Sequence, residues 1–272
     1  MSRDDHAPEI SLATITITGP DAVAFAQSQL TLDVEGIDDT LLHPAAWCRP
    51  DGRVDAVLLV AVGHRNVSLV LPRSLAESAF KRARMYSIGR KVEIAAGPAV
   101  RGGGPTASAG ECALALSCDS GRALILAELD NPDAAESAAW SLPADWLHAD
   151  VDCGMPWILP ETAGMFLPQM LGLEALGGLS YRKGCFPGQE VIARVHYRGR
   201  LTRRLAGFRL RASQPPLPGT TFELADKPAV ILYAVARSGS NDASDGLAVV
   251  STDVEGGAEF HIAGAEGALV SR

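Results

Sequence analysis

The sequence lacks long apolar runs, and the longest is AVLLVAV, residues 56–62. Seven residues are too few to cross a bilayer, which takes about 20 in a helix. The first residues, MSRDDHAPEISLATITITG, also lack the apolar stretch of a secretory signal peptide. We therefore expect a cytoplasmic protein with no membrane partner. In that compartment structural disulfides are rare.

Cysteine is scarce and scattered along the chain. No C-x-x-C pair occurs, and the two nearest cysteines are six positions apart. This spacing argues against a local zinc or iron–sulfur cage, so we expect no metal site. A site built from distant cysteines, or a cluster shared with a partner, stays open. The five cysteines are Cys48, Cys112, Cys118, Cys153 and Cys185.

Several common catalytic motifs are also absent. The chain has no P-loop, no G-x-G-x-x-G after a strand, no G-x-S-x-G and no H-E-x-x-H. Nucleotide hydrolysis, dinucleotide redox chemistry, serine esterase activity and zinc protease activity therefore lose their usual support. Aromatic residues make up only 6% of the chain, which leaves few side chains for stacking on RNA bases.

Charge is unevenly distributed in this acidic protein. The net charge is −8, which argues against a simple nucleic-acid binder. Residues 181–204 nevertheless contain seven cations and one acid, a net charge of +6, so the remainder carries −14. A basic segment in an acidic chain is a candidate anion site.

Periodicity and composition predict an α+β protein. The 272 residues, 47% of them hydrophobic, suit two or three units that share an interface. We expect an N-terminal α+β domain (1–98), a second α+β domain (99–203) and a small antiparallel β-barrel (204–272) with short alternating runs between turn residues. A loop or linker is expected at 95–111. Strands are predicted at residues 9–19, 41–48, 53–62, 67–71, 91–95, 112–118 and 122–129, and helices at 19–30, 73–88 and 143–154.

The stretch YRKGCFPGQE, residues 181–190, is the strongest candidate site. Gly184 and Gly188 permit a sharp turn and a close approach of ligand to the main chain. Lys183 and the arginine before it would favour the thiolate of Cys185, the form that is nucleophilic or binds metal. The alternative is a tight turn around a small buried thiol, which packs as an apolar residue.

Hydrogen-bonding and basic residues follow directly. Gln189 donates and accepts and Glu190 accepts, which suits a flat heterocycle with an amide-like edge. The alternation from residue 191 onward predicts a strand with Arg194 and Arg198 on one face. Arginine forks suit carboxylates and phosphates, although charge can also protect a solvated edge strand. We expect His196 to be a core or rim residue, because no second metal ligand has a suitable spacing.

The turn RPDG, residues 49–52, connects two predicted strands, and two acids lie in it or just after it. Asp51 and Asp55 are candidates for a general base or a ligand. The alternative is that Asp51 caps the turn and Asp55 faces solvent.

Taken together, these motifs resemble the YgfZ family of folate-binding proteins, relatives of the aminomethyltransferase (T-protein) of the glycine cleavage system. KGCFPGQE matches the family signature K-G-C-[FY]-x-G-Q-E. FAQSQLTLDV, PDGRV, GMPWI and FLPQMLGLEALGG stand in the family order before it. By position, the resemblance assigns a functional thiol, the turn glycines and a folate or anion site. These residues are Cys185, Gly184, Gly188, Lys183, Gln189, Glu190, Arg194, Arg198, Asp33 and Asp55.

The resemblance implies a T-protein-like, three-domain α+β ring around tetrahydrofolate or a derivative. It further implies a role in assembly, maintenance or repair of iron–sulfur proteins, with linked effects on tRNA modification. The expected partners are a reduced folate and iron–sulfur proteins or their assembly factors. Direct nucleic-acid binding is not expected.

Three positions depart from the pattern of the family and its relatives. Leu32 replaces a common asparagine, Ala56 replaces the second acid of the T-protein pair, and Asp150 stands where arginine is common. These changes count against aminomethyl transfer, which stays the second hypothesis and predicts turnover that depends on Asp55. An RNA-binding module that uses residues 194–204 ranks third.

Overall fold

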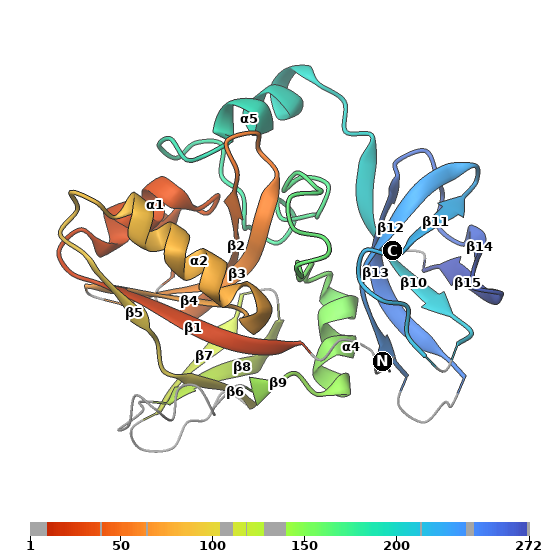
Figure 1. The fold of residues 1–272 in the computed structure, drawn as a ribbon, viewed down its shortest axis with the longest axis horizontal. Helices are drawn as coiled ribbons and strands as arrows, with labels where there is room; N and C mark the ends of the chain where they lie inside the picture. The colour runs from red at the N-terminus through yellow and green to blue at the C-terminus, as the bar shows by residue number, and fades with distance from the viewer. Residues whose placement is uncertain are drawn as a thin grey trace, which may run out of the picture.

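The computed structural model describes residues 10–38, 40–63, 65–103, 111–117, 119–127, 140–212, 214–237 and 242–270. These residues form two β-sheets with a few helices, in agreement with the predicted α+β class (Figure 1). None of the described helices has the length and apolar character needed to cross a membrane. Cys118 lies outside the described residues.

Nine described strands form the first sheet, in the order β5-β1-β4-β3-β2-β7-β8-β6, and β9 pairs with β1. All its pairings are antiparallel except that between β2 and β7, which is parallel. The strands are β1 (Ser11–Thr18), β2 (Leu41–Cys48), β3 (Val54–Val62), β4 (Asn66–Pro72), β5 (Glu93–Ala96), β6 (Ala99–Gly103), β7 (Glu111–Leu116), β8 (Asp119–Ala127) and β9 (Trp140–Ser141).

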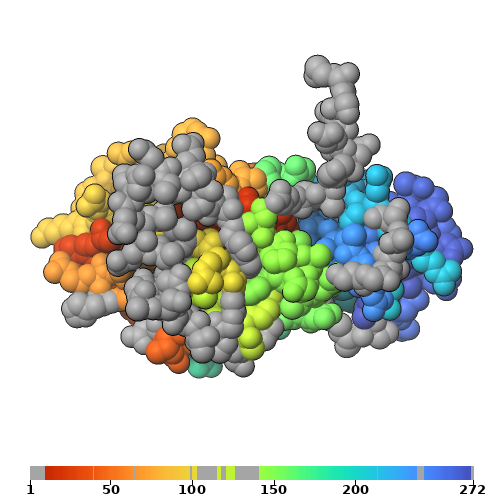
Figure 2. Space-filling model, turned by 90° about the horizontal axis from the view of Figure 1, so that it is seen from below, coloured from red at the N-terminus to blue at the C-terminus, as the bar shows by residue number. Residues whose placement is uncertain are grey.

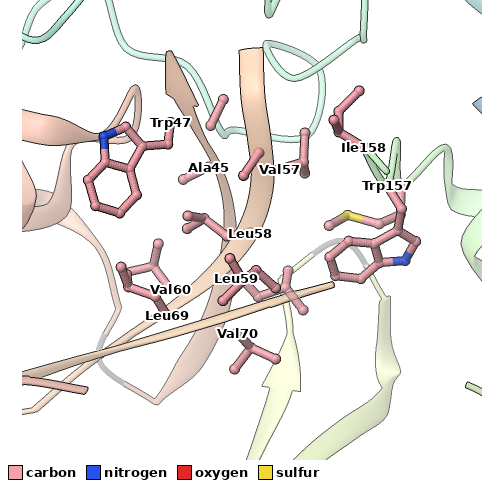
Figure 3. Close-up of a cluster of buried hydrophobic side chains, with 14 of the residues drawn as sticks. Ala45, Trp47, Val57, Leu58, Leu59, Val60, Leu69, Val70, Trp157 and Ile158 are labelled. Atoms are coloured by element: carbon pink, nitrogen blue, oxygen red, sulfur yellow. The ribbon is translucent and has the colours of Figure 1, made fainter. Parts of the chain in front are cut away.

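The β2–β3 hairpin is central to this sheet and to the site. Seven of the nine residues of β3 are buried, as expected for a strand covered on both faces. The turn between the strands has Gly52 at φ +81°, a left-handed conformation that glycine adopts without strain. Trp47 lies at one side of the core cluster around the hairpin and Trp157 at the other (Figure 3).

Two helices pack on this sheet, and two more follow later in the chain. Both α1 and α2 contact the sheet, and they lie in front of it in Figure 1. The α4 helix ends at Gly154, which is left-handed at φ +76°, as its sequence predicts. The helices are α1 (Ala22–Gln29), the 3₁₀ turn η1 (Val34–Gly36), α2 (Arg73–Tyr86), α4 (Ala144–Cys153) and α5 (Gln189–Arg198).

The second sheet consists of six described antiparallel strands in the order β11-β12-β13-β10-β15-β14. Its outer strands β11 and β14 contact each other, and the rings of Phe222 and Phe260 lie 4.6 Å apart. The sheet therefore curls into a nearly closed barrel, as predicted. Its strands are β10 (Arg203–Leu210), β11 (Thr221–Leu224), β12 (Lys227–Ala236), β13 (Ser244–Ser251), β14 (Glu259–Ile262) and β15 (Ala265–Leu269).

The second sheet packs on both faces. Val230 and Leu232 belong to the main core, whereas Ile231 belongs to the smaller core inside the curled sheet. The phenol of Tyr233 donates a hydrogen bond to the carbonyl of Met155, 2.9 Å away. In Figure 2 the segment that contains α4 and the following loops (green) lies between the two sheets. The sheets are thus joined through a shared apolar interface.

Two local predictions are wrong. Residues 191–198 are not a strand but form most of α5. Only Ile192 of this helix is buried, so the alternating sequence does not correspond to a buried and an exposed face of a strand. An acid in the first turn and cations in the last suit the helix dipole. The expected loop at 95–111 contains β6, which pairs with β8. The predicted division at residue 98 stays a prediction, and strands from both sides of it share the first sheet.

Candidate functional site

The first turn of α5 lies against the tip of the β2–β3 hairpin (Figure 1). Gly188 precedes the helix at φ +81°, and a Cβ there would lie 2.5 Å from both the Arg49 carbonyl oxygen and Gly52 Cα. No side chain fits this contact. From the other side, the Gln169 amide donates a 2.7 Å hydrogen bond to the Ile192 carbonyl. The GQE part of the signature is therefore held across the hairpin tip.

Lys183 connects the signature to the end of α1. Its ammonium donates hydrogen bonds of 2.6 Å each to the carbonyls of Gln27, Leu30 and Leu32. A cation suits these carbonyls, since the C-terminal end of a helix carries partial negative charge. All three ammonium protons are directed at the backbone. In this arrangement Lys183 holds the loop after α1, and none of its donors is left for a ligand.

Burial changes the acidity of this lysine. Lys183 is only 8% exposed, and burial lowers its pKa to about 8 although Asp33 and Glu35 act in the opposite direction. Removing an ammonium from water disfavours its charged form, while the nearby carboxylates favour it. The cost of burial dominates here.

The FAQSQLTLDV stretch, residues 25–34, shapes the same loop. Gln27 donates to the Asp33 carboxylate at 2.8 Å and accepts from the Val34 N–H at 2.7 Å. The Thr31 hydroxyl donates to the Gly178 carbonyl at 2.7 Å and accepts from the Ala46 N–H at 2.8 Å. Asp33 is thus brought to the Lys183 end of the site, with one carboxylate oxygen engaged by Gln27.

Cys185 is presented on the surface between two anchored neighbours. Lys183 and Phe186 are both buried, and the ammonium lies 5.3 Å from the Phe186 ring centroid. Gly184 has no atom within 4 Å of an added Cβ, and Cys185 is exposed. The alternative of a buried thiol in a tight turn is therefore wrong for the described conformation. Cys48, by contrast, is fully buried, and burial raises the pKa of its thiol.

Asp55 lies farther down the hairpin in a cluster of charges. One carboxylate oxygen accepts from Arg49 Nε, and the other accepts from Arg82 Nη1 at 2.7 Å. Arg82 also donates to the Cys48 carbonyl, and its guanidinium lies 5.3 Å from the Trp47 ring centroid. Asp55 is therefore paired with two arginines, unlike the solvent-facing alternative. Asp51 remains exposed at the turn and accepts from the Arg53 N–H at 3.1 Å.

A cavity of about 210 Å³ opens beside this cluster, between α2 and the β2–β3 hairpin. Trp47, Arg49, Asp55 and Arg82 line it together with small and apolar side chains. Sequence reasoning missed Trp47, Arg49 and Arg82. For Arg82 a signal was present, because helical spacing places it on the same face as the buried Leu75 and Ala79. A cation on an apolar helix face needs a partner, and Asp55 is that partner.

The outward side of α5 carries the remaining predicted residues. Glu190, Arg194 and Arg198 are exposed, and Gln189 is half-buried. His196 is at the rim, where its ring stacks on Tyr181 with centroids 3.8 Å apart. Among the described residues no group of three or more His, Cys, Asp or Glu side chains could hold a metal ion.

Asp150, one of the three departures from the family pattern noted in the sequence, is fully buried, and both of its carboxylate oxygens accept hydrogen bonds. It accepts a 2.7 Å hydrogen bond from Arg122 Nη1 and another of 2.7 Å from Trp157 Nε1. The cation at this place thus comes from β8. A buried ion pair thus ties β8 to α4.

The structure therefore groups the predicted residues other than Arg194 and Arg198 around the hairpin tip. Lys183 and Asp33 lie on the α1 side, Gly188, Gln189 and Glu190 at the start of α5, and Asp55 beside the cavity. The exposed Cys185 belongs to the connection between the first two groups.

This fold is that of a glycine cleavage T-protein. The aminomethyltransferase T of the glycine cleavage system from Bartonella henselae superposes with a TM-score of 0.69, covering 98% of this chain and 85% of that one at 14% sequence identity. That likeness establishes the fold alone.

Within this fold the chain belongs to the YgfZ family. Proteins named tRNA-modifying protein YgfZ are 30% identical over 78% of the chain in Sodalis glossinidius and 31% identical over 82% in Edwardsiella ictaluri. The YgfZ of Klebsiella pneumoniae is 30% identical over 82% of the chain. These alignments cover 73%, 74% and 75% of the relatives, respectively. No protein-family model matches the chain.

Proposed function

We propose that this protein binds a reduced folate at the hairpin tip and supports tRNA modification as an accessory factor for iron–sulfur proteins. The observation that carries the proposal is that three family motifs, FAQSQLTLDV, PDGRV and FLPQMLGLEALGG, contact the signature segment or the start of α5. These contacts lie beside an exposed cysteine. The names of the relatives supply the link to tRNA modification. The T-protein fold is consistent with a folate ligand.

The residues present fit an anionic, heterocyclic ligand. Arg49 and Arg82 beside the cavity suit carboxylates, and Gln189 offers both a donor and an acceptor near the start of α5. A volume of about 210 Å³ is smaller than the roughly 300–1,000 Å³ of pockets that enclose a drug-sized ligand. It therefore suits one end of a folate, and the rest would extend along the tip. A bound folate would supply a carrier of one-carbon groups.

The iron–sulfur role rests on Cys185. A single thiol cannot complete a four-cysteine cluster site, so its contact with a cluster, or with the protein that carries one, is transient. Its exposed position between two buried anchors allows a partner protein to reach it. Aminomethyl transfer is not proposed, because Ala56 replaces the second acid and both oxygens of Asp55 accept from arginines.

Calorimetry with tetrahydrofolate and its derivatives tests the ligand. We expect saturable binding below high micromolar concentrations.

Cys185→Ala and Cys185→Ser should fold as the wild type does, because the side chain is exposed. Both variants should fail to rescue iron–sulfur enzyme activity in cells that lack the protein. Thr221→Ala, at an exposed position on β11 away from the signature, is the control and should rescue. The proposal is wrong if no folate binds and Cys185→Ala restores iron–sulfur enzyme activity as well as the wild type does.

A further inference from the structure

The C-terminal half of α5 carries a group of aromatic rings at the surface. The His196 ring stacks on Tyr181 with centroids 3.8 Å apart, and Tyr197 lies edge-on to His196 at 4.7 Å. Glu174 accepts from the Tyr181 hydroxyl at 3.2 Å and lies 3.8 Å from His196 Nδ1. Tyr197 is 67% exposed. The group is therefore held in place while most of Tyr197 remains open to solvent.

Exposed cations accompany these rings. Helical spacing places Arg194 and Arg198 on the same side of α5 as Tyr197. Both arginines are exposed, and neither forms an ion pair with a described residue. Arg200 follows directly after the helix, with a side chain that is 82% exposed and 3.3 Å from Asp253. Three guanidinium groups thus accompany one exposed ring, on what we call the α5 face (Arg194, Tyr197, Arg198 and Arg200).

The charge of this region differs from that of the whole chain. Residues 181–204 carry +6, although the net charge of the protein is −8. Two of their seven cations are used internally, Lys183 on three carbonyls and Arg204 on the Val254 carbonyl at 2.7 Å. In Figure 1 the helix lies at one end of the molecule, above the β2–β3 hairpin. The overall acidity that counts against nucleic-acid binding therefore does not describe this surface.

We infer that the α5 face binds the unpaired nucleotides of a tRNA loop. Single-stranded RNA is recognised by stacking of its bases on aromatic side chains and by cations that follow its phosphates. Tyr197 supplies the ring, and the three arginines supply the cations. The choice of tRNA rests on the proposed function, to which the names of the relatives contribute.

Other polyanions fit this surface less well. An acidic protein segment would use the arginines and leave the exposed ring of Tyr197 without a role. A membrane surface would need a row of apolar side chains, and α5 exposes only Val191 and Tyr197 as large apolar residues. An RNA loop uses both features of the α5 face, because each nucleotide brings a base and a phosphate.

Fluorescence anisotropy with labelled RNA tests the inference on the full-length protein. The probes are an unmodified tRNA transcript and a single-stranded oligonucleotide of about 12 nucleotides. We expect both to bind. For the oligonucleotide, the logarithm of the affinity should fall with the logarithm of salt concentration with a slope of about −2, since three phosphate contacts contribute about 0.7 each.

Arginine variants test the electrostatic part. Arg198→Met should weaken oligonucleotide binding several-fold and make the salt slope shallower by about 0.7. Arg211→Met removes an arginine whose side chain is equally exposed, just after β10, and should leave the affinity and the slope unchanged. Equal losses in the two variants would show that only the net charge of the protein matters, which would overturn the inference.

Tyrosine variants separate stacking from charge. Tyr197→Leu should weaken the oligonucleotide about tenfold, or about 1.4 kcal/mol, whereas Tyr197→Phe keeps the ring and should bind as the wild type does. Both changes are at an exposed position, so both proteins should keep one cooperative unfolding transition. Wild-type affinity of Tyr197→Leu would overturn the inference. Polyglutamate that displaces the probe as well as unlabelled RNA does, at the same charge concentration, would also overturn it.

Calorimetry of the same proteins with tetrahydrofolate separates this inference from the proposed function. If folate binds and neither RNA does, the inference is wrong and the folate site stands. If RNA binds through Tyr197 and folate does not bind, the α5 face stands and the proposed function fails. If neither folate nor RNA binds, both are wrong.

Discussion

At the scale of single residues, two charged groups that the sequence predicted as ligand contacts have partners within the protein. The protons of Lys183 are used on the carbonyls after α1, and the oxygens of Asp55 are used on Arg49 and Arg82. Both therefore hold other parts of the site in position. The residue types were predictable from the motifs, but their partners come from distant segments that a sequence pattern does not pair.

The buried lysine makes a prediction about pH. The pKa of Lys183 is about 8 in the folded protein and about 10.5 when unfolded, so between these values the unfolded state binds more protons. The unfolding free energy of the wild type should therefore rise with pH across this window, relative to Lys183→Met, which cannot titrate. At neutral pH the substitution should destabilise the fold by about 2 kcal/mol, because three carbonyls lose their donor.

Urea unfolding of the wild type and of Lys183→Met at pH 7.5 and 9.5 measures how the difference between their unfolding free energies changes with pH. Taking the difference cancels the titration of other groups. A stability gap that stays constant or narrows at pH 9.5 would show that burial does not lower the pKa of Lys183.

At the scale of elements, most of the secondary structure followed from local pattern, and α5 did not. Strands β1 to β4 and helices α1, α2 and α4 lie where alternation, turn residues and helical spacing predict them. The segment after Gly188 alternates in sequence but also carries helical signals, an acid in its first turn and cations in its last, which the alternation obscured. The strand β6 lies in a Gly- and Pro-rich stretch, where its pairing with β8 outweighs weak propensity.

The two glycines of the signature should differ sharply in their tolerance of alanine. Gly188 is left-handed and in contact with backbone of the hairpin turn, whereas Gly184 faces open space. Gly188→Ala should cost about 2 kcal/mol or more in unfolding free energy and loosen α5, because it combines left-handed strain with a collision. Gly184→Ala should change stability by less than about 0.5 kcal/mol.

Chemical denaturation and limited proteolysis near α5 compare these variants. Equal stability of the two alanine variants would mean that the close contact between Gly188 and the β2–β3 turn is absent in solution.

At the scale of the whole molecule, the two sheets depend on each other. The second sheet places residues such as Val230, Leu232 and Val249 in the main core, in addition to its own smaller core. The sequence predicted a small curled sheet after residue 203, and the structure confirms it. Its second buried face was not predictable, since the partner surface comes from earlier segments of the chain.

This shared core predicts one cooperative unfolding transition for the full chain. A fragment of residues 203–270 should bind hydrophobic dyes or associate, because its outer apolar face would be uncovered. Calorimetric unfolding and sedimentation measure the two proteins side by side. A monomeric fragment with its own sharp transition would show that the interface contributes little.

The central claim is that a reduced folate binds where the signature meets the β2–β3 hairpin. A crystal structure of the protein with bound tetrahydrofolate tests it most directly. We predict ligand density against the start of α5, near Cys185. Ligand bound away from both the signature and the cavity, or no ligand at saturating concentration, would contradict the claim.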